Sequence, residues 1–461
     1  MLDIIILAAG KGTRMKSDLP KVLHPVGGRP LLTHVISAAQ ELEPKTKNNF
    51  HIVVGHGADK VANKVRASFD NSESINFIEQ TEQLGTGHAV KQVLPHLNND
   101  SVSLILYGDV PLIQQETLTR LIDQVDHNTL ALLTVTLDDS TGYGRIIRND
   151  SDAVTAIVEQ KDALEEQLEI KEVNTGIMAV NSQQLQQWLP LLSNDNAQGE
   201  YYLTDIIAMA VAEGVLIATE QPQHEWEVMG INNRQQQAEL ERIYQYKQAS
   251  QLMTDGVTLY DPNRFDCRGT LSCGTDVIID VNCVFEGDNR IGNNVTIGPN
   301  CIFKNATIGN DTQINANSII EDASLATACT IGPFARLRPG TELADNAKIG
   351  NFVETKKAII GKGSKVNHLS YVGDAVLGKD VNVGAGTITC NYDGVNKHQT
   401  TIGDNVFVGS NTALVAPVTV EDGATIGAGS TINKDIEKDT LSLTRSPQKT
   451  FKEWQRPVKK K

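Results

Sequence analysis

The chain has 461 residues, which is more than one hydrophobic core usually organises and predicts two or more domains. A hydrophobic fraction of 40% and a charged fraction of 21% exclude a disordered chain, and a formal net charge of −15 argues against nucleic acid and anionic lipid as partners. No apolar run approaches the roughly 18 residues of a membrane helix, so we expect a soluble protein that makes no contact with a membrane.

The chain begins with a short apolar run, Ile4–Ala9, that we interpret as a buried strand. Asp3 precedes this run and Gly10-Lys11-Gly12 ends it, so it lacks the features of a secretory signal. Further β-rich runs (51–54, 103–107 and 130–136) alternate with segments of helical period (31–42 and 118–125). The alternation predicts βαβ units around a mostly parallel sheet, in a Rossmann-like domain over residues 1–230 that binds ligands at the carboxyl ends of its strands.

A glycine-rich loop follows the first strand, with the sequence Leu7-Ala8-Ala9-Gly10-Lys11-Gly12-Thr13-Arg14-Met15 and Pro20-Lys21 shortly after it. The backbone N–H groups of such a loop can cradle phosphate oxygens, while Lys11, Arg14 and Lys21 supply positive charge. The spacing matches neither a Walker A motif nor a dinucleotide fingerprint. From the loop alone, a phosphate site and an ordinary turn both remain open.

The chain from Asn232 to about Met253 predicts a long helix, because it is rich in Gln, Glu, Arg, Ala and Leu and has no Gly or Pro until Gly256. We place a linker helix at 231–256. Beyond it an aliphatic residue recurs every six positions, as at Leu414, Val420, Ile426 and Ile432. This period predicts a parallel β-helix of hexapeptide repeats over 257–461, in which each inward aliphatic side chain contributes about 1.5–3 kcal/mol.

The six-residue period is interrupted between Ile388 and Ile402, so we expect residues 390–398 to leave the coil as a loop, where functional residues often lie. All 6 cysteines lie between Cys267 and Cys390 without a CxxC pair, which indicates neither a zinc site nor a disulfide framework and favours the cytoplasm. Cys283 and Cys301 are 18 residues apart, and we expect them to stack in neighbouring coils.

His368 occupies the third position of a hexapeptide, where its side chain should point outward. An inert surface histidine and a general base both fit that position. Stacking could bring basic and polar residues near it, which would suit an anionic substrate, and Glu354 could orient the imidazole. These residues are Arg336, Arg338, Glu354, Lys356, Lys357 and Tyr371.

The first half resembles the sugar-phosphate nucleotidyltransferases in LAAGKGTRM, LGTG, YGDVP, GYGR, VEQKD, NTG and NNR. The resemblance implies that uridine triphosphate is held by Leu7, Ala8, Ala9, Gly10, Lys21, Gln80, Gly85, Thr86, Tyr107, Gly108 and Asp109. It further implies that the sugar is held by Gly144, Glu159 and Asn174. Asp109 and Asn232 would coordinate Mg²⁺, which suits an ion that prefers few protein oxygens together with phosphate and water.

The second half resembles the acetyltransferase part of the bifunctional N-acetylglucosamine-1-phosphate uridylyltransferase/glucosamine-1-phosphate N-acetyltransferase family in GPFARLRPG, GNFVETKKA, HLSYVGDA and GAGTITCNYDG. The resemblance implies a left-handed β-helix, a homotrimer, and His368 as the base that activates glucosamine 1-phosphate for attack on acetyl-CoA. The sugar phosphate would be bound by Arg338, Lys356, Tyr371 and Asn382. Acetyl-CoA would be bound by Ala385, Asn391, Tyr392, Ser410, Ala428 and Arg445, and the Lys459-Lys460-Lys461 tail could reach its phosphates.

Together the two halves predict a bifunctional enzyme that makes UDP-N-acetylglucosamine, a cell-wall precursor, from glucosamine 1-phosphate through N-acetylglucosamine 1-phosphate. Two alternatives compete with this hypothesis. One is a nucleotidyltransferase whose β-helix serves only assembly, and the other is a binding scaffold with two degenerate sites. The presence of His368 argues against the first alternative, and the intact glycine loop and Asp109 argue against the second.

Overall fold

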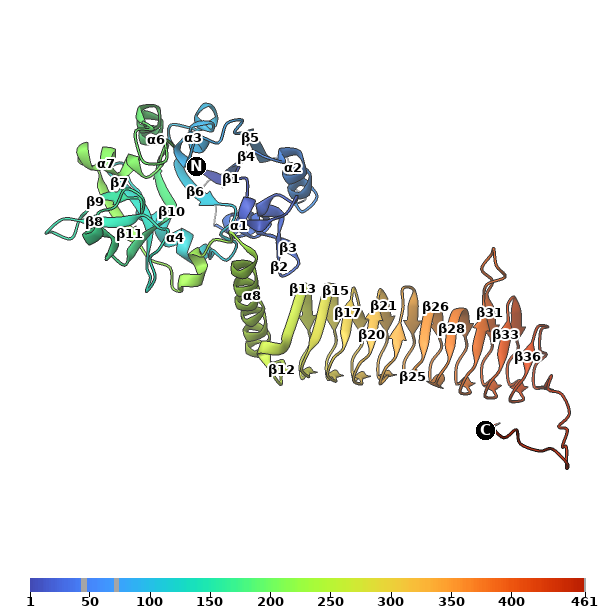
Figure 1. Ribbon diagram of the computed structural model, residues 1–461. Coiled ribbons are helices and arrows are strands. Elements are labelled where there is room, and N and C mark those ends of the chain that lie inside the picture. The colour runs from blue at the N-terminus through green and yellow to red at the C-terminus, as the bar shows by residue number, and fades with distance from the viewer. Residues whose placement is uncertain (43–47, 70–73, 460–461) are drawn as a thin grey trace. The chain divides into compact units, whose positions relative to one another are not determined.

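The computed structural model describes residues 1–42, 48–69 and 74–459. Contacts within the chain define two compact units, Met1–Tyr244 and Gln245–Lys461, and helix α8 (Arg234–Thr254) spans the division (Figure 1). Leu240 on this helix packs into a core of the first unit, and Ala249 packs into the core of the second. Among the described helices, none combines the length and the apolar character needed to cross a bilayer.

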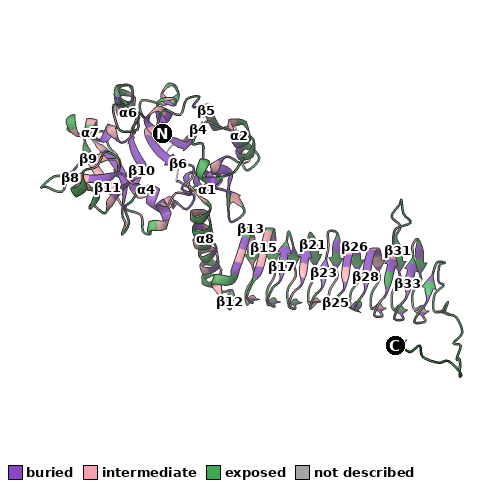
Figure 2. Cartoon of the chain, in the orientation of Figure 1, coloured by how far each residue is buried: buried purple, intermediate pink, exposed green. Residues whose placement is uncertain are grey.

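The first unit is built around a sheet with the strand order β11-β7-β10-β6-β1-β4-β5, whose central strands are buried (Figure 2). Strand β1 pairs in parallel with β4 and β6, as predicted, but β10 runs antiparallel to both β6 and β7. The sheet is therefore mixed. The strands are β1 (Leu2–Ala8), β4 (Asn48–Val54), β5 (Ile75–Glu79), β6 (Val102–Tyr107), β7 (Thr129–Thr136), β10 (Glu172–Asn181) and β11 (Leu216–Glu220).

Two hydrophobic cores form on opposite faces of this sheet, because successive side chains of a strand point to opposite sides. Ile4 and Ile6 of β1 pack into one core, while Ile5 and Leu7 pack into the other. The main helices of the unit are α1 (Leu31–Gln40), α2 (Ala58–Arg66), α3 (Thr86–Lys91), α4 (Gln115–Asp123), α6 (Ser182–Trp188) and α7 (Asp205–Ala212).

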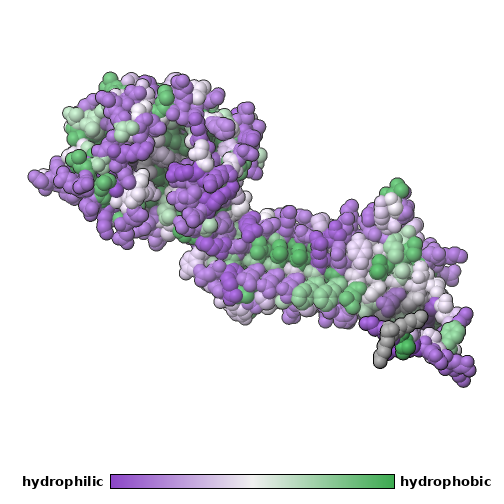
Figure 3. All heavy atoms as spheres, in the orientation of Figure 1, coloured by the Kyte–Doolittle hydropathy of each residue, from purple (hydrophilic) through white to green (hydrophobic). Residues whose placement is uncertain are grey.

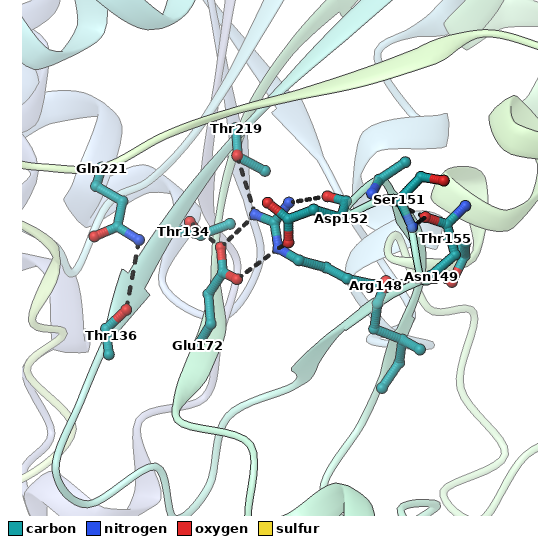
Figure 4. Close-up of polar contacts among 12 residues, drawn as sticks. Thr134, Thr136, Arg148, Asn149, Ser151, Asp152, Thr155, Glu172, Thr219 and Gln221 are labelled. Atoms are coloured by element: carbon teal, nitrogen blue, oxygen red, sulfur yellow. Dashed lines mark hydrogen bonds and ion pairs between the residues drawn. The ribbon is translucent and has the colours of Figure 1, made fainter.

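A β-hairpin made of β8 (Arg145–Arg148) and β9 (Val154–Val158) extends from the sheet. It pairs with β10 only at Val173 and Arg145. A second connection lies further along β8, where Arg148 binds Glu172 of β10 and the hydroxyl of Thr219 on β11 (Figure 4). The hairpin is thus held to the sheet by a backbone pairing, by a cluster of polar side chains and by Ile146 and Val154, which pack into one of the two cores.

The second unit is a parallel β-helix with the hexapeptide repeats typical of the left-handed class. One sheet contains β12 (Thr258–Leu259), β14 (Ile278–Ile279), β16 (Thr296–Ile297), β19 (Gln313–Ile314), β22 (Thr330–Ile331), β25 (Lys348–Asn351), β27 (Lys365–His368), β29 (Asn382–Val383), β32 (Phe407–Val408), β35 (Thr425–Ile426) and β37 (Leu441–Ser442). The longer sheet contains β13 (Phe265–Cys273), β15 (Cys283–Ile291), β17 (Ile302–Lys304), β18 (Thr307–Ile308), β20 (Ile319–Glu321), β21 (Ala323–Leu325), β23 (Arg336–Leu337), β24 (Thr341–Leu343), β26 (Glu354–Ile360), β28 (Tyr371–Leu377), β30 (Ile388–Cys390), β31 (Thr400–Ile402), β33 (Ala413–Val415), β34 (Val418–Val420) and β36 (Thr431–Ile432).

The aliphatic residues of the six-residue period are buried along the axis of the coil, which confirms the predicted packing; Leu414, Val420, Ile426 and Ile432 all belong to this core. The thiols of Cys283 and Cys301 lie against each other in neighbouring coils, also as predicted. All six cysteines are free.

One corner of the β-helix carries apolar side chains at positions of left-handed backbone conformation. Asn300 and Asn317 occupy this corner in earlier coils, with φ near 60°. Phe334, Phe352 and Leu369 replace them in the next coils, have φ values of 56°, 55° and 49°, and are 49%, 56% and 63% exposed. Large apolar residues rarely adopt this conformation or this exposure, so the corner departs from the usual pattern. Apolar side chains gather along the surface of this unit (Figure 3).

Candidate active sites

A cavity opens at the carboxyl ends of β1 and β6, where the sequence predicted ligand binding. The glycine-rich loop forms one wall of the cavity. The loop packs closely against Lys21 at Gly12, where an added Cβ would lie only 2.7 Å from Cβ of Lys21. The predicted residues that line the cavity are Leu7, Ala8, Ala9, Gly10, Lys21, Gln80, Gly85, Thr86, Tyr107 and Asp109. Val22, Gln83, Ala89 and Glu200 also line it and were not predicted.

Lys21, Asp109 and Asn232 form a charged cluster in this unit. The Lys21 ammonium binds the Asp109 carboxylate and donates to Oδ1 of Asn232 at 3.1 Å. Arg14 donates to the same Asn232 oxygen at 3.0 Å. Two oxygen atoms from distant parts of the chain thus lie around a single cationic atom.

This pair of oxygen donors fits a hard divalent cation such as Mg²⁺, which takes one or two protein oxygens and completes its shell with phosphate and water. In the described residues no group of three or more His, Cys, Asp or Glu side chains is gathered in the way that an all-protein metal site requires. Asp109 and Asn232 therefore suit an ion that arrives with a phosphate substrate.

Tyr107 lies close enough to Asp109 of this cluster, and to Glu159 in a second polar group, to interact electrostatically with both carboxylates. Burial raises the pKa of Tyr107, and the carboxylates of Glu159 and Asp109 raise it further. Burial also raises the pKa of the Glu159 carboxyl, against a hydrogen bond of 3.2 Å from the Thr204 hydroxyl. Asp162 adds to this rise through repulsion between the carboxylates.

Gly144 and Asn174 lie beside Glu159. An added Cβ at Gly144 would be 3.5 Å from the Glu159 carboxyl, and the backbone N–H of Asn174 donates to the Gly144 carbonyl at 2.9 Å. Gly144 directly precedes the β8–β9 hairpin and Glu159 directly follows it. The remaining predicted residue, Gly108, donates its backbone N–H to the Leu7 carbonyl at 2.9 Å, which ties the ends of β6 and β1 together.

In the second unit, the His368 side chain is exposed at the end of β27, as predicted. Its Nδ1 atom lies 2.7 Å from Oδ1 of Asn351, the residue stacked beneath it in the preceding coil. The expectation that Glu354 orients the imidazole was wrong, because Glu354 instead accepts a hydrogen bond of 2.7 Å from Arg338. Asn351 was not predicted, although its separation of 17 residues from His368, which is one coil, is the signal in the sequence that could have identified it.

Most of the other predicted sugar-phosphate residues lie on the longer sheet. Tyr371 stacks on Glu354, and Lys356 pairs with Gly373, over which the Tyr371 ring lies. The Arg338 guanidinium lies close enough to Tyr371 for the two groups to interact electrostatically. Asn382 belongs to the other sheet, where it pairs with Lys365 and Phe407, so the structure does not bring it into the Arg338 cluster.

Three of the six predicted acetyl-CoA residues form a column in successive turns of the β-helix. They are Ala385, Ser410 and Ala428, and each lies two residues after a strand (β29, β32 or β35) of the sheet that carries His368. The turns are joined by hydrogen bonds of 2.8 Å from Asn411 N to Ala385 O and from Gly429 N to Ser410 O. The Arg445 guanidinium approaches this column, since an added Cβ at Gly427 would be 3.8 Å from its Nη2.

Residues 391–398 leave the coil, which confirms the predicted loop except at Cys390, which ends β30 and pairs with Val415. Asn391 is buried and donates to Asp374, whereas Tyr392 is 57% exposed and its ring lies 4.6 Å below Nζ of Lys397. In the basic tail, Lys459 is exposed, while Lys460 and Lys461 lie outside the described residues.

Three family models match parts of the chain. Residues 4–172 match the MobA-like NTP transferase domain, residues 268–353 match the GMPPB C-terminal domain, and residues 399–434 match the bacterial transferase hexapeptide with six repeats.

Relatives match over the full length. The bifunctional protein GlmU of Saccharophagus degradans (strain 2-40) is 62% identical over 460 residues, which is 100% of each chain. That of Marinobacter nauticus (strain VT8) is 61% identical over 458 residues, or 99% of each chain. Among solved structures, a UDP-glucose pyrophosphorylase complexed with UDP-glucose matches 53% of this chain and 98% of its own at 16% identity, with a TM-score of 0.43.

Proposed function

The chain belongs to the GlmU family of bifunctional proteins, and we propose that it makes UDP-N-acetylglucosamine by two transfers at two separate sites. It is a transferase with a nucleotidyltransferase unit followed by a hexapeptide transferase unit. The first reaction transfers acetyl from acetyl-CoA to glucosamine 1-phosphate in the β-helix. The second transfers uridylyl from uridine triphosphate to the resulting N-acetylglucosamine 1-phosphate and releases pyrophosphate.

His368 acts as the general base of the acetyl transfer. Oδ1 of Asn351 can only accept a hydrogen bond, so the proton of the neutral imidazole lies on Nδ1 and the lone pair lies on Nε2. Nε2 takes a proton from the 2-amino group, the amine nitrogen attacks the thioester carbonyl, and the carbon–sulfur bond breaks to release the thiol of coenzyme A. Asn351 is thus a positioning residue for the base.

Cationic side chains on the β-helix hold the anionic groups of both substrates. Arg338, Lys356 and Tyr371 bind glucosamine 1-phosphate from the longer sheet, and Asn382 contributes from the sheet that carries His368. Ala385, Asn391, Tyr392, Ser410, Ala428 and Arg445 bind acetyl-CoA. The Arg338 guanidinium, already directed by Glu354 at 2.7 Å, presents its other N–H groups to a phosphate. The column formed by Ala385, Ser410 and Ala428 offers small side chains and turn backbone along which an extended ligand can lie.

The uridylyl transfer needs no protein nucleophile. A phosphate oxygen of N-acetylglucosamine 1-phosphate attacks the α-phosphorus, and the bond from that phosphorus to the bridging oxygen breaks as pyrophosphate leaves. Lys21 and the N–H groups of the glycine loop stabilise the developing negative charge. When bound by Asp109 and Asn232, Mg²⁺ supplies further charge neutralisation and orients the phosphates.

The sugar lies near Gly144, Glu159 and Asn174, which adjoin the cavity at Tyr107. The partly buried Glu159 carboxylate can accept hydrogen bonds from sugar hydroxyls, and Gly144 leaves room for the ring because a side chain there would begin 2.9 Å from Ile157. Tyr107 interacts electrostatically with both Glu159 and Asp109, so it lies near the sugar and near the charged cluster.

We also propose that the protein is a homotrimer that works in the cytoplasm. The exposed apolar corner formed by Phe334, Phe352 and Leu369 supports contact with another copy. Leu369 directly follows His368 in the chain, so this contact would lie near the acetyltransferase site. Six free thiols, two of them in contact, support a reducing compartment.

The observation that carries the proposal is the pair of sites in one chain: the Lys21–Asp109–Asn232 cluster in the first unit and His368 with Asn351 in the second. The test adds glucosamine 1-phosphate, acetyl-CoA, uridine triphosphate and Mg²⁺ stepwise and follows free thiol and pyrophosphate separately. Thiol release should need only the first two compounds, and pyrophosphate release should follow once all four are present. Pyrophosphate release from N-acetylglucosamine 1-phosphate and uridine triphosphate, together with no thiol release from glucosamine 1-phosphate and acetyl-CoA, would favour a nucleotidyltransferase with a structural β-helix.

A further inference from the structure

We propose that His88 is a positioning residue that makes the nucleotide site select uracil over cytosine, by fixing which end of the Gln80 amide faces the base. The inference rests on the proposed function, in which Gln80 helps to hold uridine triphosphate. It concerns a residue outside the set predicted from the sequence, on helix α3 beside the cavity.

Gln80 lies at the uncharged end of the cavity, together with Gly85, Thr86 and Ala89. The cations Lys21 and Arg14 lie with Asp109 and Asn232, so the triphosphate belongs to that end and the neutral base belongs near Gln80. Gln80 is only 3% exposed, and its backbone is fixed by a hydrogen bond of 2.8 Å from its N–H to the Val54 carbonyl. Its side chain therefore has few alternatives to the observed position.

The Gln80 amide nitrogen has two hydrogens, and each has a partner. Nε2 donates to the Gly85 carbonyl at 3.2 Å and to Nδ1 of His88 at 3.1 Å. The carbonyl oxygen, Oε1, is the end of the amide that remains for a ligand. A base that meets Oε1 must present an N–H group.

For Nδ1 of His88 to accept, the imidazole proton must lie on Nε2, which is 3.1 Å from the side-chain amide of Gln92. The amide of Gln92 also donates to the His88 carbonyl at 3.0 Å, but Gln92 is partly exposed, so it can rotate, exchange that bond for one to water and accept the proton of Nε2. The Gln80 amide nitrogen is held between the Gly85 carbonyl and His88, so turning this amide over would set Oε1 against the Gly85 carbonyl and leave both partners unsatisfied. The tautomer of His88 is therefore set by the buried amide.

Uracil and cytosine differ in the group that meets Oε1. Uracil carries a hydrogen on N3 and donates to an acceptor, whereas cytosine has a lone pair on N3 that would repel it. An amide held with Oε1 toward the base thus favours uracil, and an amide free to rotate would lose part of that preference. Discrimination by such a polar group can be large, because the wrong base leaves buried polar atoms unpaired.

The experiment compares kcat/KM for UTP and for CTP in the full-length enzyme, measured as pyrophosphate release with N-acetylglucosamine 1-phosphate and Mg²⁺. His88→Leu removes the acceptor, while His88→Asn keeps one, because Oδ1 of Asn is attached to Cγ as Nδ1 is in His. His96→Leu removes a histidine elsewhere on the same segment and serves as the matched control. Fluorescence of Trp188 and Trp226, which lie in the same unit as His88 and His96, reports that each variant is folded.

The ratio of kcat/KM for UTP to that for CTP should fall about tenfold in His88→Leu, the effect of losing one hydrogen bond that orients a buried group. It should be restored in His88→Asn and unchanged in His96→Leu. An unchanged ratio in His88→Leu, or a ratio in His88→Asn as low as in His88→Leu, would overturn the inference. A wild-type enzyme that releases no pyrophosphate from UTP would instead refute the proposed function itself.

Discussion

The guanidinium of Arg148 and the carboxylate of Glu172 form a two-point ion pair, with Nε to Oε2 and Nη2 to Oε1 both at 2.8 Å (Figure 4). The hydrogen bonds from Arg148 hold the pKa of Glu172 below its usual range, while burial opposes this effect. Thr134 adds a third hydrogen bond to the carboxylate at 2.9 Å. Because Arg148 ends β8 and Glu172 begins β10, the pair fixes the hairpin whose two ends carry Gly144 and Glu159.

We expect Arg148→Met to loosen this hairpin. The variant leaves a partly buried carboxylate without its cation and should lower the free energy of unfolding by about 1–3 kcal/mol. It should also raise KM for N-acetylglucosamine 1-phosphate severalfold while leaving KM for UTP unchanged. Urea unfolding and steady-state kinetics measure the two effects.

Arg120→Met provides the control for that variant, since Arg120 binds Glu220 at 2.8 Å in the same unit but contacts neither end of the hairpin. It should cost stability without changing either KM. Equal KM values for the sugar phosphate in the two variants would show that the Arg148–Glu172 pair has no role in placing the sugar site.

His34 should make the first unit less stable in mild acid. Burial lowers the pKa of His34 to about 4, although its hydrogen bond to the Val26 carbonyl opposes the shift. The folded state then binds fewer protons than the unfolded state between pH 6.5 and 4, so the stabilisation is full above pH 6.5 and declines as the pH falls through that window. The loss between pH 7 and pH 5 should be about 2 kcal/mol.

Urea unfolding followed by tryptophan fluorescence at the two pH values checks this prediction, because Trp188 and Trp226 lie in the first unit. His34→Gln keeps a donor for the Val26 carbonyl and does not titrate. Its stability should depend less on pH than that of the wild type. The same dependence in both proteins would assign the acid sensitivity to other groups.

Asn351→Leu should slow acetyl transfer by about tenfold, because the imidazole of His368 loses the partner that fixes its tautomer. Asn351→Asp keeps an acceptor at the same place and should retain most of the activity. The pH profile of kcat/KM distinguishes this role from a packing defect: Asn351→Asp should shift the acidic limb to higher pH, since a carboxylate stabilises the imidazolium and the base must be unprotonated to act. Wild-type acetylation by Asn351→Leu would remove Asn351 from the mechanism.

Removal of divalent cations should separate the two reactions. A chelator should stop pyrophosphate release, because the α- and β-phosphates then lose the charge that Asp109 and Asn232 would hold near them. Thiol release should continue at its original rate. Loss of thiol release under the same conditions would place a metal requirement in the β-helix as well.

The sequence was most informative where a repeat or a motif constrains the backbone. The six-residue period identified the buried aliphatic residues and the outward position of His368, because each residue type serves one place in the coil. The glycine loop and the residues after β6 were predicted at the cavity because the carboxyl ends of neighbouring parallel strands share an edge.

Contacts between side chains from different coils or strands were harder to predict. Glu354 has the chemistry to orient His368, but it stacks beneath Tyr371 and its carboxylate is taken by Arg338, while Asn351 lies directly below the base. Likewise the antiparallel course of β10 depends on pairing between distant segments, which no local pattern in the sequence records. His88 gave no signal because its role depends on a hydrogen bond to Gln80.

Two independent active sites in one chain are tested most directly by measuring both reactions in Asp109→Ala and His368→Ala. In Asp109→Ala, thiol release from acetyl-CoA should proceed at the wild-type rate and pyrophosphate release should be abolished. In His368→Ala the pattern should reverse when N-acetylglucosamine 1-phosphate is supplied. A folded Asp109→Ala protein that loses both activities, or a His368→Ala protein that still acetylates at the wild-type rate, would contradict the account.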